Sequence, residues 1–378
     1  MTKKIYITSL HMLHGGVEMS ISLLANALVK RAYDVEILCV YNLGEPVYEI
    51  DERVTITYLT NVHPNKEEIA KAIHSMNPFA MLREALYAIK VLRLKRKSMV
   101  DIFKRIREGV IISTRNEHTL LLSKYGNDEV KKIAQLHHDH RFDKRLLKDF
   151  AEGYENIDVF LLLTDELRQE VSEVMIKNQK TEILTMPNFL KSVDSAKKFK
   201  EKRERQVVAV GRLHEVKGFA RMIRIWSNVC REDDVVLKIV GDGEQREPLE
   251  KIIADCKLED KVVLVGALRH DDVLLEMSKS LMYLMTSYTE GFPFVLIEAM
   301  SEGLPVISYD VRVGPRAIIQ DGINGYLVRE DEEIDFVNRV QELLNDEKRR
   351  VQMSQKAIER ANEFTEDIIM ERWEEVIR

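Results

Sequence analysis

Cysteine is scarce in this chain of 378 residues, in which Cys39, Cys230 and Cys256 are the only three. They are widely spaced, and each lies in or beside an apolar segment. This spacing matches neither a disulfide framework nor a zinc site. We therefore expect three reduced thiols in or near the hydrophobic core.

Long apolar runs are also missing. Nothing approaches the roughly 18 consecutive apolar residues of a membrane-spanning helix, and no charged segment followed by an apolar one opens the chain as a signal peptide would. A cytoplasmic location is therefore expected. The net charge of −6 at pH 7 argues against a general nucleic-acid-binding protein, because such proteins carry a strongly basic surface.

The length exceeds what one hydrophobic core usually supports, so two domains are expected. Short apolar segments alternate with helical periodicity in both halves, which predicts an α/β fold with two doubly wound parallel sheets. The strands expected in the first half are 4–10, 35–40, 54–59, 110–113, 133–136 and 159–163. Those expected in the second half are 207–210, 235–240, 262–265, 281–285, 306–309 and 326–328.

The charged segment 191–205 contains few large apolar residues and is typical of a linker. We predict an N-terminal domain at 1–187 and a C-terminal domain at 188–363. The remaining segment, 364–378, predicts a terminal amphipathic helix, because four apolar residues recur there at helical spacing. These are Ile368, Ile369, Trp373 and Ile377.

Two carboxylates bracket an otherwise apolar run in the second half. Glu290 follows an expected strand, and Glu298 lies eight positions later. Pro293 suits the first turn of a helix and Gly303 suits its end, so Glu290 is expected beside a helix amino terminus, where free amides attract anions. Glu298 then lies on an apolar helix, where a carboxylate is costly unless donors such as ribose hydroxyls meet it. The alternative is a surface Glu or one paired with an Arg.

Arg212 and Lys217 lie five residues apart in a loop that follows strand 207–210 and opens a helix. Both cations and the helix dipole can converge there on one diphosphate, or both cations can be solvated at the surface. Glycine pairs follow other strands. Gly15 and Gly16 let a ligand approach backbone amides or simply form a tight turn, and the same alternatives hold for Gly241.

These motifs resemble those of the GT4 family of retaining, nucleotide-sugar-dependent glycosyltransferases with the GT-B fold. The resemblance rests on Glu-x7-Glu with Gly-Phe-Pro after the first Glu, on Gly-Arg-Leu with a later Lys-Gly, and on Gly-Gly-Val-Glu near the start. It implies two Rossmann-like domains facing a cleft, with the acceptor on the first and the nucleotide sugar on the second. The helix 364–378 is expected to pack back on the first domain.

The same resemblance implies a reaction and its partners. A hexosyl unit would pass from a nucleotide sugar, most often UDP-linked, to a hydroxyl of a glycan or lipid-linked acceptor in bacterial envelope or exopolysaccharide assembly. Arg212 and Lys217 would stabilise the leaving diphosphate. Glu298 would take the ribose hydroxyls.

The sugar and the base receive their own contacts in this resemblance. Glu290, with the amides of Gly291 and Phe292, would orient the sugar hydroxyls. The loop that reaches Leu268 lies where the family reads uracil through backbone groups. Gly241 would leave room for the ligand.

The run from His137 to His140 contains three histidines and an aspartate, which invites a metal interpretation. Adjacent side chains rarely point together, however, and no second cluster completes a site. The resemblance instead places a histidine near the donor sugar, and by register we favour His137 over His138. The metal-binding Asp-x-Asp of many GT-A enzymes is absent, so a reaction without a metal or other cofactor is predicted.

Residues 83–107 are strongly basic and are interleaved with apolar side chains. This pattern predicts a basic amphipathic helix that lies on an anionic membrane surface at the inner face of the cell membrane. The alternative is an ordinary surface helix. The cations are Arg83, Lys90, Arg93, Lys95, Arg96, Lys97, Lys104, Arg105 and Arg107, against Glu84 and Asp101.

Three other functions compete with a transferase. A non-catalytic GT-B-like partner or glycan-binding subunit tends to lose its acidic and basic motif residues, which remain here. A GT-B sugar-nucleotide epimerase would convert the donor without an acceptor. A dinucleotide dehydrogenase is disfavoured, because neither first-strand loop has the sequence Gly-x-Gly-x-x-Gly.

Overall fold

The computed structural model describes residues 3–191, 203–229 and 234–378. Cys230 and most of the predicted linker lie outside these residues. The chain divides into two compact units. Unit 1 comprises Met1–Leu162, Leu167–Met186 and Arg372–Arg378, and unit 2 comprises Leu163–Glu166 and Pro187–Glu371.

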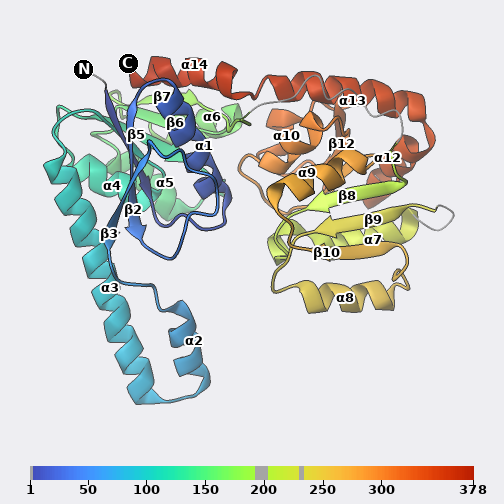
Figure 1. Ribbon diagram of the computed structural model, residues 1–378, viewed down its shortest axis with the longest axis horizontal. Coiled ribbons are helices and arrows are strands. Elements are labelled where there is room, and N and C mark those ends of the chain that lie inside the picture. The colour runs from blue at the N-terminus through green and yellow to red at the C-terminus, as the bar shows by residue number, and fades with distance from the viewer. Residues whose placement is uncertain (1–2, 192–202, 230–233) are drawn as a thin grey trace. The chain divides into compact units, whose positions relative to one another are not determined.

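Unit 1 is built on a seven-stranded parallel sheet in the order β3-β2-β1-β4-β5-β6-β7 (Figure 1). Six of its strands were predicted. The seventh, β7, was not, because it has only two large apolar residues and lies at the sheet edge. The strands are β1 (Lys4–Ser9), β2 (Asp34–Tyr41), β3 (Thr55–Thr60), β4 (Val110–Ser113), β5 (Lys131–Leu136), β6 (Val159–Leu162) and β7 (Glu182–Thr185).

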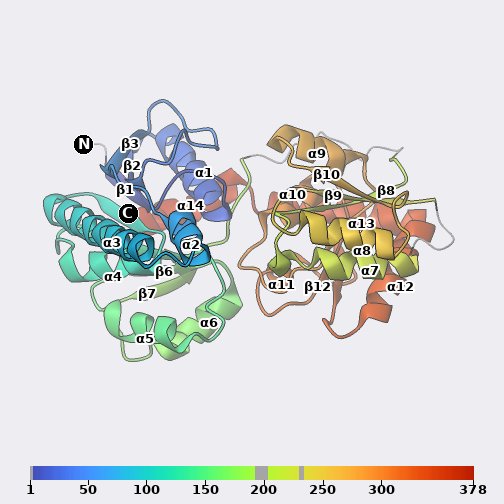
Figure 2. The ribbon, with the colours of Figure 1, turned by 90° about the horizontal axis from the view of Figure 1, so that it is seen from below.

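Helices cover the sheet of unit 1 in layers. Helix α1 packs on β1 and β2, while α3, α4 and α5 pack side by side (Figure 2). Their apolar faces explain this arrangement, since α1 turns Ile21, Leu24 and Leu28 into the core. The helices are α1 (Gly16–Lys30), α2 (Lys66–His74), α3 (Pro78–Arg105), α4 (Asn116–Tyr125), α5 (Lys144–Gly153) and α6 (Asp165–Val174).

The terminal helix α14 (Glu366–Ile377) has the predicted amphipathic character. Ile369, Trp373 and Ile377 are buried. Ile368 is 46% exposed, so the prediction was wrong for that residue, which lies about 100° around the helix from Ile369. The last turn joins unit 1, where Lys3 Nζ donates a hydrogen bond to the Ile377 carbonyl at 2.6 Å.

Unit 2 contains a six-stranded parallel sheet in the order β10-β9-β8-β11-β12-β13. All six strands were predicted, to within about two residues at each end. They are β8 (Gln206–Val210), β9 (Val236–Val240), β10 (Val262–Gly266), β11 (Tyr283–Met285), β12 (Val306–Tyr309) and β13 (Gly325–Val328).

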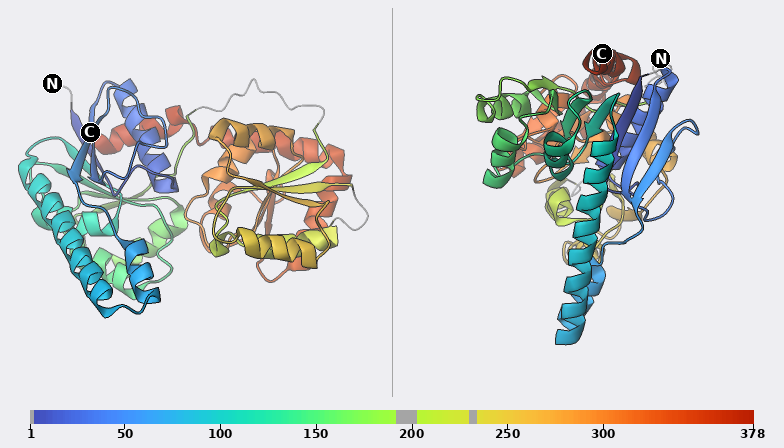
Figure 3. Two further views of the ribbon diagram at one scale, coloured as in Figure 1. Left: turned by 60° about the horizontal axis from the view of Figure 1, so that its bottom comes forward. Right: turned by 90° about the vertical axis from the view of Figure 1, so that its left-hand side faces the viewer.

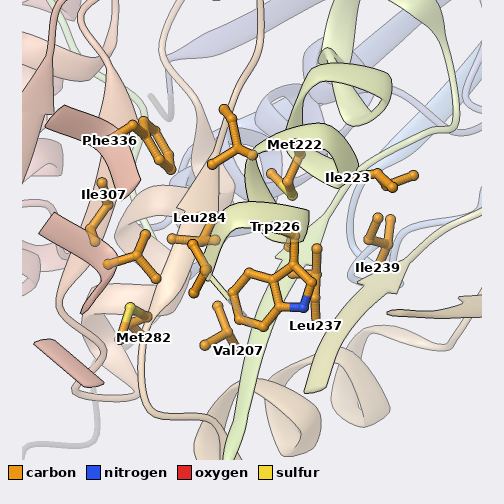
Figure 4. Close-up of a cluster of buried hydrophobic side chains, with 14 of the residues drawn as sticks. Val207, Met222, Ile223, Trp226, Leu237, Ile239, Met282, Leu284, Ile307 and Phe336 are labelled. Atoms are coloured by element: carbon orange, nitrogen blue, oxygen red, sulfur yellow. The ribbon is translucent and has the colours of Figure 1, made fainter. Parts of the chain in front are cut away.

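The core of unit 2 surrounds Trp226, which is fully buried on α7 (Figure 4). Val207 and Leu237 from the sheet and Phe336 from α12 belong to the same cluster. Helices α7, α8 and α12 pack on one face of the sheet, and α9, α10 and α13 on the other. The helices are α7 (Phe219–Val229), α8 (Arg246–Asp255), α9 (His270–Lys279), α10 (Phe294–Ser301), α11 (Pro315–Ile318), α12 (Glu333–Asn345) and α13 (Glu347–Asn362).

Throughout residues 3–191, 203–229 and 234–378, no helix combines the length and the hydropathy that a membrane crossing requires.

Candidate active site

The sheet of unit 2 has a topological switch point between β8 and β11. From this pair the chain builds outward in both directions, through β9 to β10 and through β12 to β13. In parallel α/β sheets, ligands bind outside the carboxyl ends of the strands at such a point, because the two loops diverge there. The loop after β8 carries Arg212 and Lys217, and the loop after β11 carries Glu290.

Lys217 and Glu290 meet at this switch point. Lys217 Nζ donates a hydrogen bond to Glu290 Oε1 at 2.8 Å, and the glutamate side chain is only 10% exposed. Both side chains line a small pocket whose wall includes Tyr283 and Thr286. The pair holds one positive and one negative group at the mouth of the switch point, although the two residues lie 73 positions apart in sequence.

The two loops interlock through their backbones. Gly218 has a φ of +67°, and a Cβ added there would lie 2.0 Å from the Thr286 carbonyl oxygen. Thr286 Oγ1 in turn donates to the Gly218 carbonyl at 2.9 Å. Because only glycine permits this approach, Gly218 fixes the position of the preceding Lys217 against the loop that carries Glu290.

Arg212 lies in the same loop as Lys217 and is exposed. Its guanidinium forms no hydrogen bond or ion pair with any residue that the structure describes, so it is available to an anion from solvent. Gly241 supports this loop from the next strand, since a Cβ added there would lie 2.0 Å from the Gly211 carbonyl oxygen. Close packing against this loop therefore explains why residue 241 is a glycine, whether or not a ligand binds.

Glu298 lies on α10 and is only 5% exposed. Burial raises the pKa of its carboxyl group, and the nearby His270 lowers it. His270 Nδ1 lies 3.8 Å from Glu298 Oε1, and no residue in the described part of the chain donates a hydrogen bond to the carboxylate. The site thus contains a buried acid with unused acceptor capacity, and the alternative of an Arg partner is not what the structure shows.

Tyr283 lies near both acids. Its hydroxyl donates to the Val210 carbonyl at 3.1 Å. Burial raises the pKa of Tyr283, and the negative charges of Glu290 and Glu298 raise it further. Sequence reasoning assigned this residue only to a buried strand and gave no signal of its place beside both carboxylates.

Helix α10 begins immediately after the Gly-Phe-Pro segment. Pro293 was predicted inside the first turn and instead precedes it as the N-cap residue. Phe292 is buried and packs edge-to-face on Phe364, with 5.4 Å between ring centroids. Gly291 is half-buried, and Leu268, in the loop after β10, is 37% exposed.

Arg221 was not predicted and holds the loop after β11 in place. Its guanidinium donates to the carbonyls of Thr286 and Ser287, at 2.6 Å each. It also stacks between Tyr288 and Tyr309, at 4.0 and 4.3 Å from the ring centroids. An arginine one turn after Lys217 was the only hint in the sequence, and such an arginine is ordinarily solvated.

In unit 1, Gly15 precedes α1 as its N-cap and Gly16 is the first residue of the helix, next to the switch point between β1 and β4. A Cβ on Gly15 would lie 2.0 Å from Glu18 Oε2, whereas Gly16 faces open space. Glu18 is buried, and its Oε1 lies 3.4 Å from Arg115 Nη2 and 3.6 Å from His11 Nδ1. The glutamate of the Gly-Gly-Val-Glu motif therefore contacts Arg115 and His11 at the carboxyl edge of this sheet.

His137 follows β5 at the same edge. Burial lowers the pKa of His137 to about 3, with smaller contributions from His138 and Arg115, so the ring is neutral at physiological pH. Its Nε2 is buried and has no hydrogen-bond partner among the described residues. His138 is exposed, whereas His140 Nε2 lies 2.9 Å from Glu170 Oε2. Within the described ranges, no group of three His, Cys, Asp or Glu residues is arranged to hold a metal ion.

Comparison with known proteins shows which protein family this chain resembles. Residues 191–360 match the family model described as glycosyl transferases group 1. The amylovoran biosynthesis glycosyltransferase AmsD of Erwinia amylovora is 27% identical over 382 residues, covering 96% of each chain. An alpha-1,4-N-acetyl-D-galactosaminyltransferase of Campylobacter jejuni, whose name includes a PP-undecaprenol-linked glycan, is 25% identical over 370 residues, covering 96% of this chain and 95% of its own.

A solved structure extends the likeness to both units. Staphylococcus aureus TarM, crystallised as a mutant with fondaparinux, alpha-GlcNAc-glycerol and UDP, has a TM-score of 0.78 to this chain. The alignment covers 100% of each chain at 17% sequence identity, which shows a common fold. The predicted GT-B architecture, with two Rossmann-like parallel-sheet domains, is confirmed.

Proposed function

We propose that the chain is a GT-B glycosyltransferase that carries out a retaining GT4-type hexosyl transfer from a UDP-sugar, since residues 191–360 match the model of glycosyl transferases group 1. The acceptor in this proposal is a hydroxyl group of a glycan or lipid-linked glycan. Relatives in bacterial polysaccharide biosynthesis support this class of acceptor, since one is named for amylovoran and another for a PP-undecaprenol-linked glycan. The UDP in the TarM crystal supports the choice of nucleotide.

The observation that carries the proposal is the meeting of Lys217 and Glu290 at the β8/β11 switch point, 2.8 Å apart. During transfer the leaving diphosphate gains negative charge, and preorganised donors aimed at that charge lower the barrier most. Lys217 is such a donor, and the exposed Arg212 follows the same strand. Lys217 must exchange its carboxylate partner for a phosphate oxygen, a change that costs little because both partners are anionic acceptors.

The two acids take the remaining polar groups of the donor. Glu298, buried and without a donor among the described residues, accepts the two ribose hydroxyls. Glu290, released from Lys217 when the diphosphate binds, accepts hydrogen bonds from sugar hydroxyls, and the amides of Gly291 and Phe292 donate to the oxygens of those hydroxyls. Leu268 lies in the loop assigned to the base. Each acid therefore gains a neutral hydroxyl donor in the bound state.

Charge stabilisation in this proposal requires no metal ion. Arg212, Lys217 and the amino terminus of α10 supply positive potential at the diphosphate. In unit 1 the neutral His137 contacts the sugar, and Gly16, whose Cβ position faces open space, permits close approach of the acceptor. Closure of the two units around the donor stays a prediction from the family resemblance.

The proposed location is the cytoplasm, at the inner face of the cell membrane. The basic segment 83–107 supports this location, and a lipid-linked acceptor would require it.

A donor screen tests the proposal. The purified chain is incubated with a panel of nucleotide sugars, and UDP release is measured with and without an added glycan acceptor. We expect slow donor hydrolysis by the wild type and a loss of about 100-fold or more in Lys217→Ala, the size typical of removing one preorganised donor. Lys251→Ala, a change at an exposed lysine of α8, is the matched control and should retain full turnover.

The competing functions give different results. UDP binding without any turnover would identify a non-catalytic partner, and conversion of the sugar without an acceptor would identify an epimerase. Unchanged turnover in Lys217→Ala would refute the diphosphate role.

A further inference from the structure

Helices α2 and α3 form a hairpin that projects from unit 1. Figure 3 shows it extending well beyond the sheet, with the turn at residues 75–77 as its tip. Only the proximal half of α3 packs on the body of unit 1, where Val91, Met99 and Phe103 are buried. The distal half packs against α2 and the segment just before it, where Asn65 Nδ2 donates to Glu84 Oε2 at 2.8 Å. Nothing in the described part of unit 1 therefore covers the outer face of the distal half.

That outer face carries a row of large apolar side chains. Phe79, Leu82, Leu86 and Ile89 recur at helical spacing and are 84, 60, 59 and 45% exposed. Met76 at the tip is 85% exposed. We call the four residues of α3 the apolar stripe. Solvated apolar surface of this continuity is unfavourable in water and marks an interaction site.

The same row becomes basic toward the body of the unit. Arg93 and Arg96 continue the helical spacing of the stripe, and Lys97 lies beside them. All three are exposed, and none forms an ion pair with a residue in the described ranges. Lys95, in contrast, is half-buried and pairs with Glu117. The exposed cations thus form a basic band adjoining the apolar stripe.

We propose that the hairpin docks tip-first on an anionic lipid bilayer, with the apolar stripe in the headgroup–acyl boundary and the basic band at the headgroups. The docking surface is inferred from the hairpin itself. Only its purpose rests on the proposed function, since a lipid-linked acceptor resides in a membrane. The stripe spans about 15 Å along α3 at about 1.5 Å per residue. Interfacial helices bury their apolar face by about 5–10 Å, so an oblique entry accommodates the stripe.

This arrangement refines the prediction from the sequence. A helix lying flat would place its apolar and basic residues at one depth along residues 83–107. Within the row of the stripe, the structure instead places Phe79 and Leu82 near the tip and Arg93 and Arg96 one to two turns beyond Ile89, while the exposed Leu92 lies beside the basic band. A second copy of the chain is a poorer occupant, because parallel pairing of two hairpins would bring their basic bands together.

Vesicle sedimentation tests the surface. We expect the wild type to bind phosphatidylcholine vesicles that contain phosphatidylglycerol and not phosphatidylcholine alone. Leu82→Ser with Leu86→Ser should weaken binding at least about tenfold, because about 0.8 kcal/mol is lost per buried methylene. Replacing Arg93, Arg96 and Lys97 by Gln should weaken it about 100-fold at low salt, since each cation near an anionic surface contributes about a factor of five. Ile334→Ser, at an 80% exposed isoleucine of unit 2, is the control and should bind as the wild type does.

Tryptophan quenching tests the orientation. The chain has two tryptophans, Trp226 and Trp373, which are at most 2% exposed, so an added surface tryptophan is distinguishable from them. Lipids brominated in their acyl chains should quench Phe79→Trp strongly and Arg96→Trp weakly. Equal quenching of both would overturn tip-first docking.

Other outcomes also decide the matter. No binding to the anionic vesicles would overturn the proposal, as would a dimer that the Leu82 and Leu86 substitutions dissociate. UDP titration of every variant separates this inference from the proposed function. Vesicle binding without UDP-sugar turnover would refute the transferase alone, and turnover without vesicle binding would refute the docking surface alone.

Discussion

The replacement Glu290→Gln should separate nucleotide binding from sugar transfer. In the free protein Lys217 Nζ donates a hydrogen bond to Glu290 Oε1 at 2.8 Å. This ion pair competes with the diphosphate for the lysine. Glutamine keeps the shape of the side chain and removes its charge. The change therefore frees Lys217 and also removes one negative charge that repels the diphosphate.

The size of the effect follows from the geometry of the pair. Two unit charges at this separation attract by about 1.5 kcal/mol in a medium like water and about 6 kcal/mol at an effective dielectric constant of 20. The lysine side chain is 28% exposed, so solvent screening and the cost of holding both side chains leave a net value of about 1 kcal/mol. Releasing that energy should tighten UDP binding about fivefold at low salt.

Isothermal titration with UDP and initial rates with the UDP-sugar measure the two quantities. We expect the dissociation constant for UDP to fall while kcat falls by about tenfold or more, because the sugar loses the carboxylate that orients it. High salt should shrink the gain in affinity. If Glu290→Gln weakens UDP binding as much as Lys217→Ala does, the two residues serve structure and the reasoning is refuted.

Three further predictions concern stability as well as activity. Glu298→Gln should raise the free energy of unfolding at pH 7 by about 1–2 kcal/mol, because burial raises the pKa of this carboxyl and its ionised form destabilises the fold above that pKa. Chemical denaturation measures this change. The same variant should bind UDP about tenfold more weakly, and an unchanged affinity would contradict the ribose role. Gly218→Ala should cost about 2–3 kcal/mol and lower the melting temperature, because its φ is +67° and the added Cβ meets the Thr286 carbonyl; an unaltered thermal midpoint would show that the loops do not interlock. Burial lowers the pKa of His118 to about 3, so the unfolded state binds a proton that the folded state does not. Stability should therefore be lost as pH falls from about 6.5 toward 3, and His118 contributes about 1.4 kcal/mol per pH unit to this loss. His118→Gln should reduce the slope in acid titrations by that amount, whereas His63→Gln, at an exposed histidine, should keep the wild-type slope.

Strand positions were predictable because buried parallel strands leave continuous apolar runs in the sequence. The edge strand β7 leaves no such run, since its side chains are half-buried or exposed and its sequence alternates weakly. The reduced state of Cys39 was predictable too, and it is a free, buried thiol. The architecture of both units can thus be predicted from the local pattern of apolar residues in the sequence.

Pairings between distant residues were not predictable from those patterns. The motifs indicated Lys217 and Glu290 separately, but their bond depends on how β8 and β11 lie side by side. Arg221 and Tyr283 were not predicted, because each acts through a backbone carbonyl that any residue could supply. Gly241 is likewise required by its close approach to a neighbouring loop, which its own sequence context does not reveal.

The last seven residues, Arg372–Arg378, belong to unit 1 although all of Pro187–Glu371 belongs to unit 2. Lys3 bonds the Ile377 carbonyl, and Arg31 pairs with Glu374 at 3.4 Å. During synthesis the first half of the chain leaves the ribosome long before these residues exist. Unit 1 therefore acquires its last helical segment only after the whole of unit 2 has been synthesised, and a chain that stopped at Glu371 would contain unit 2 and lack this part of unit 1.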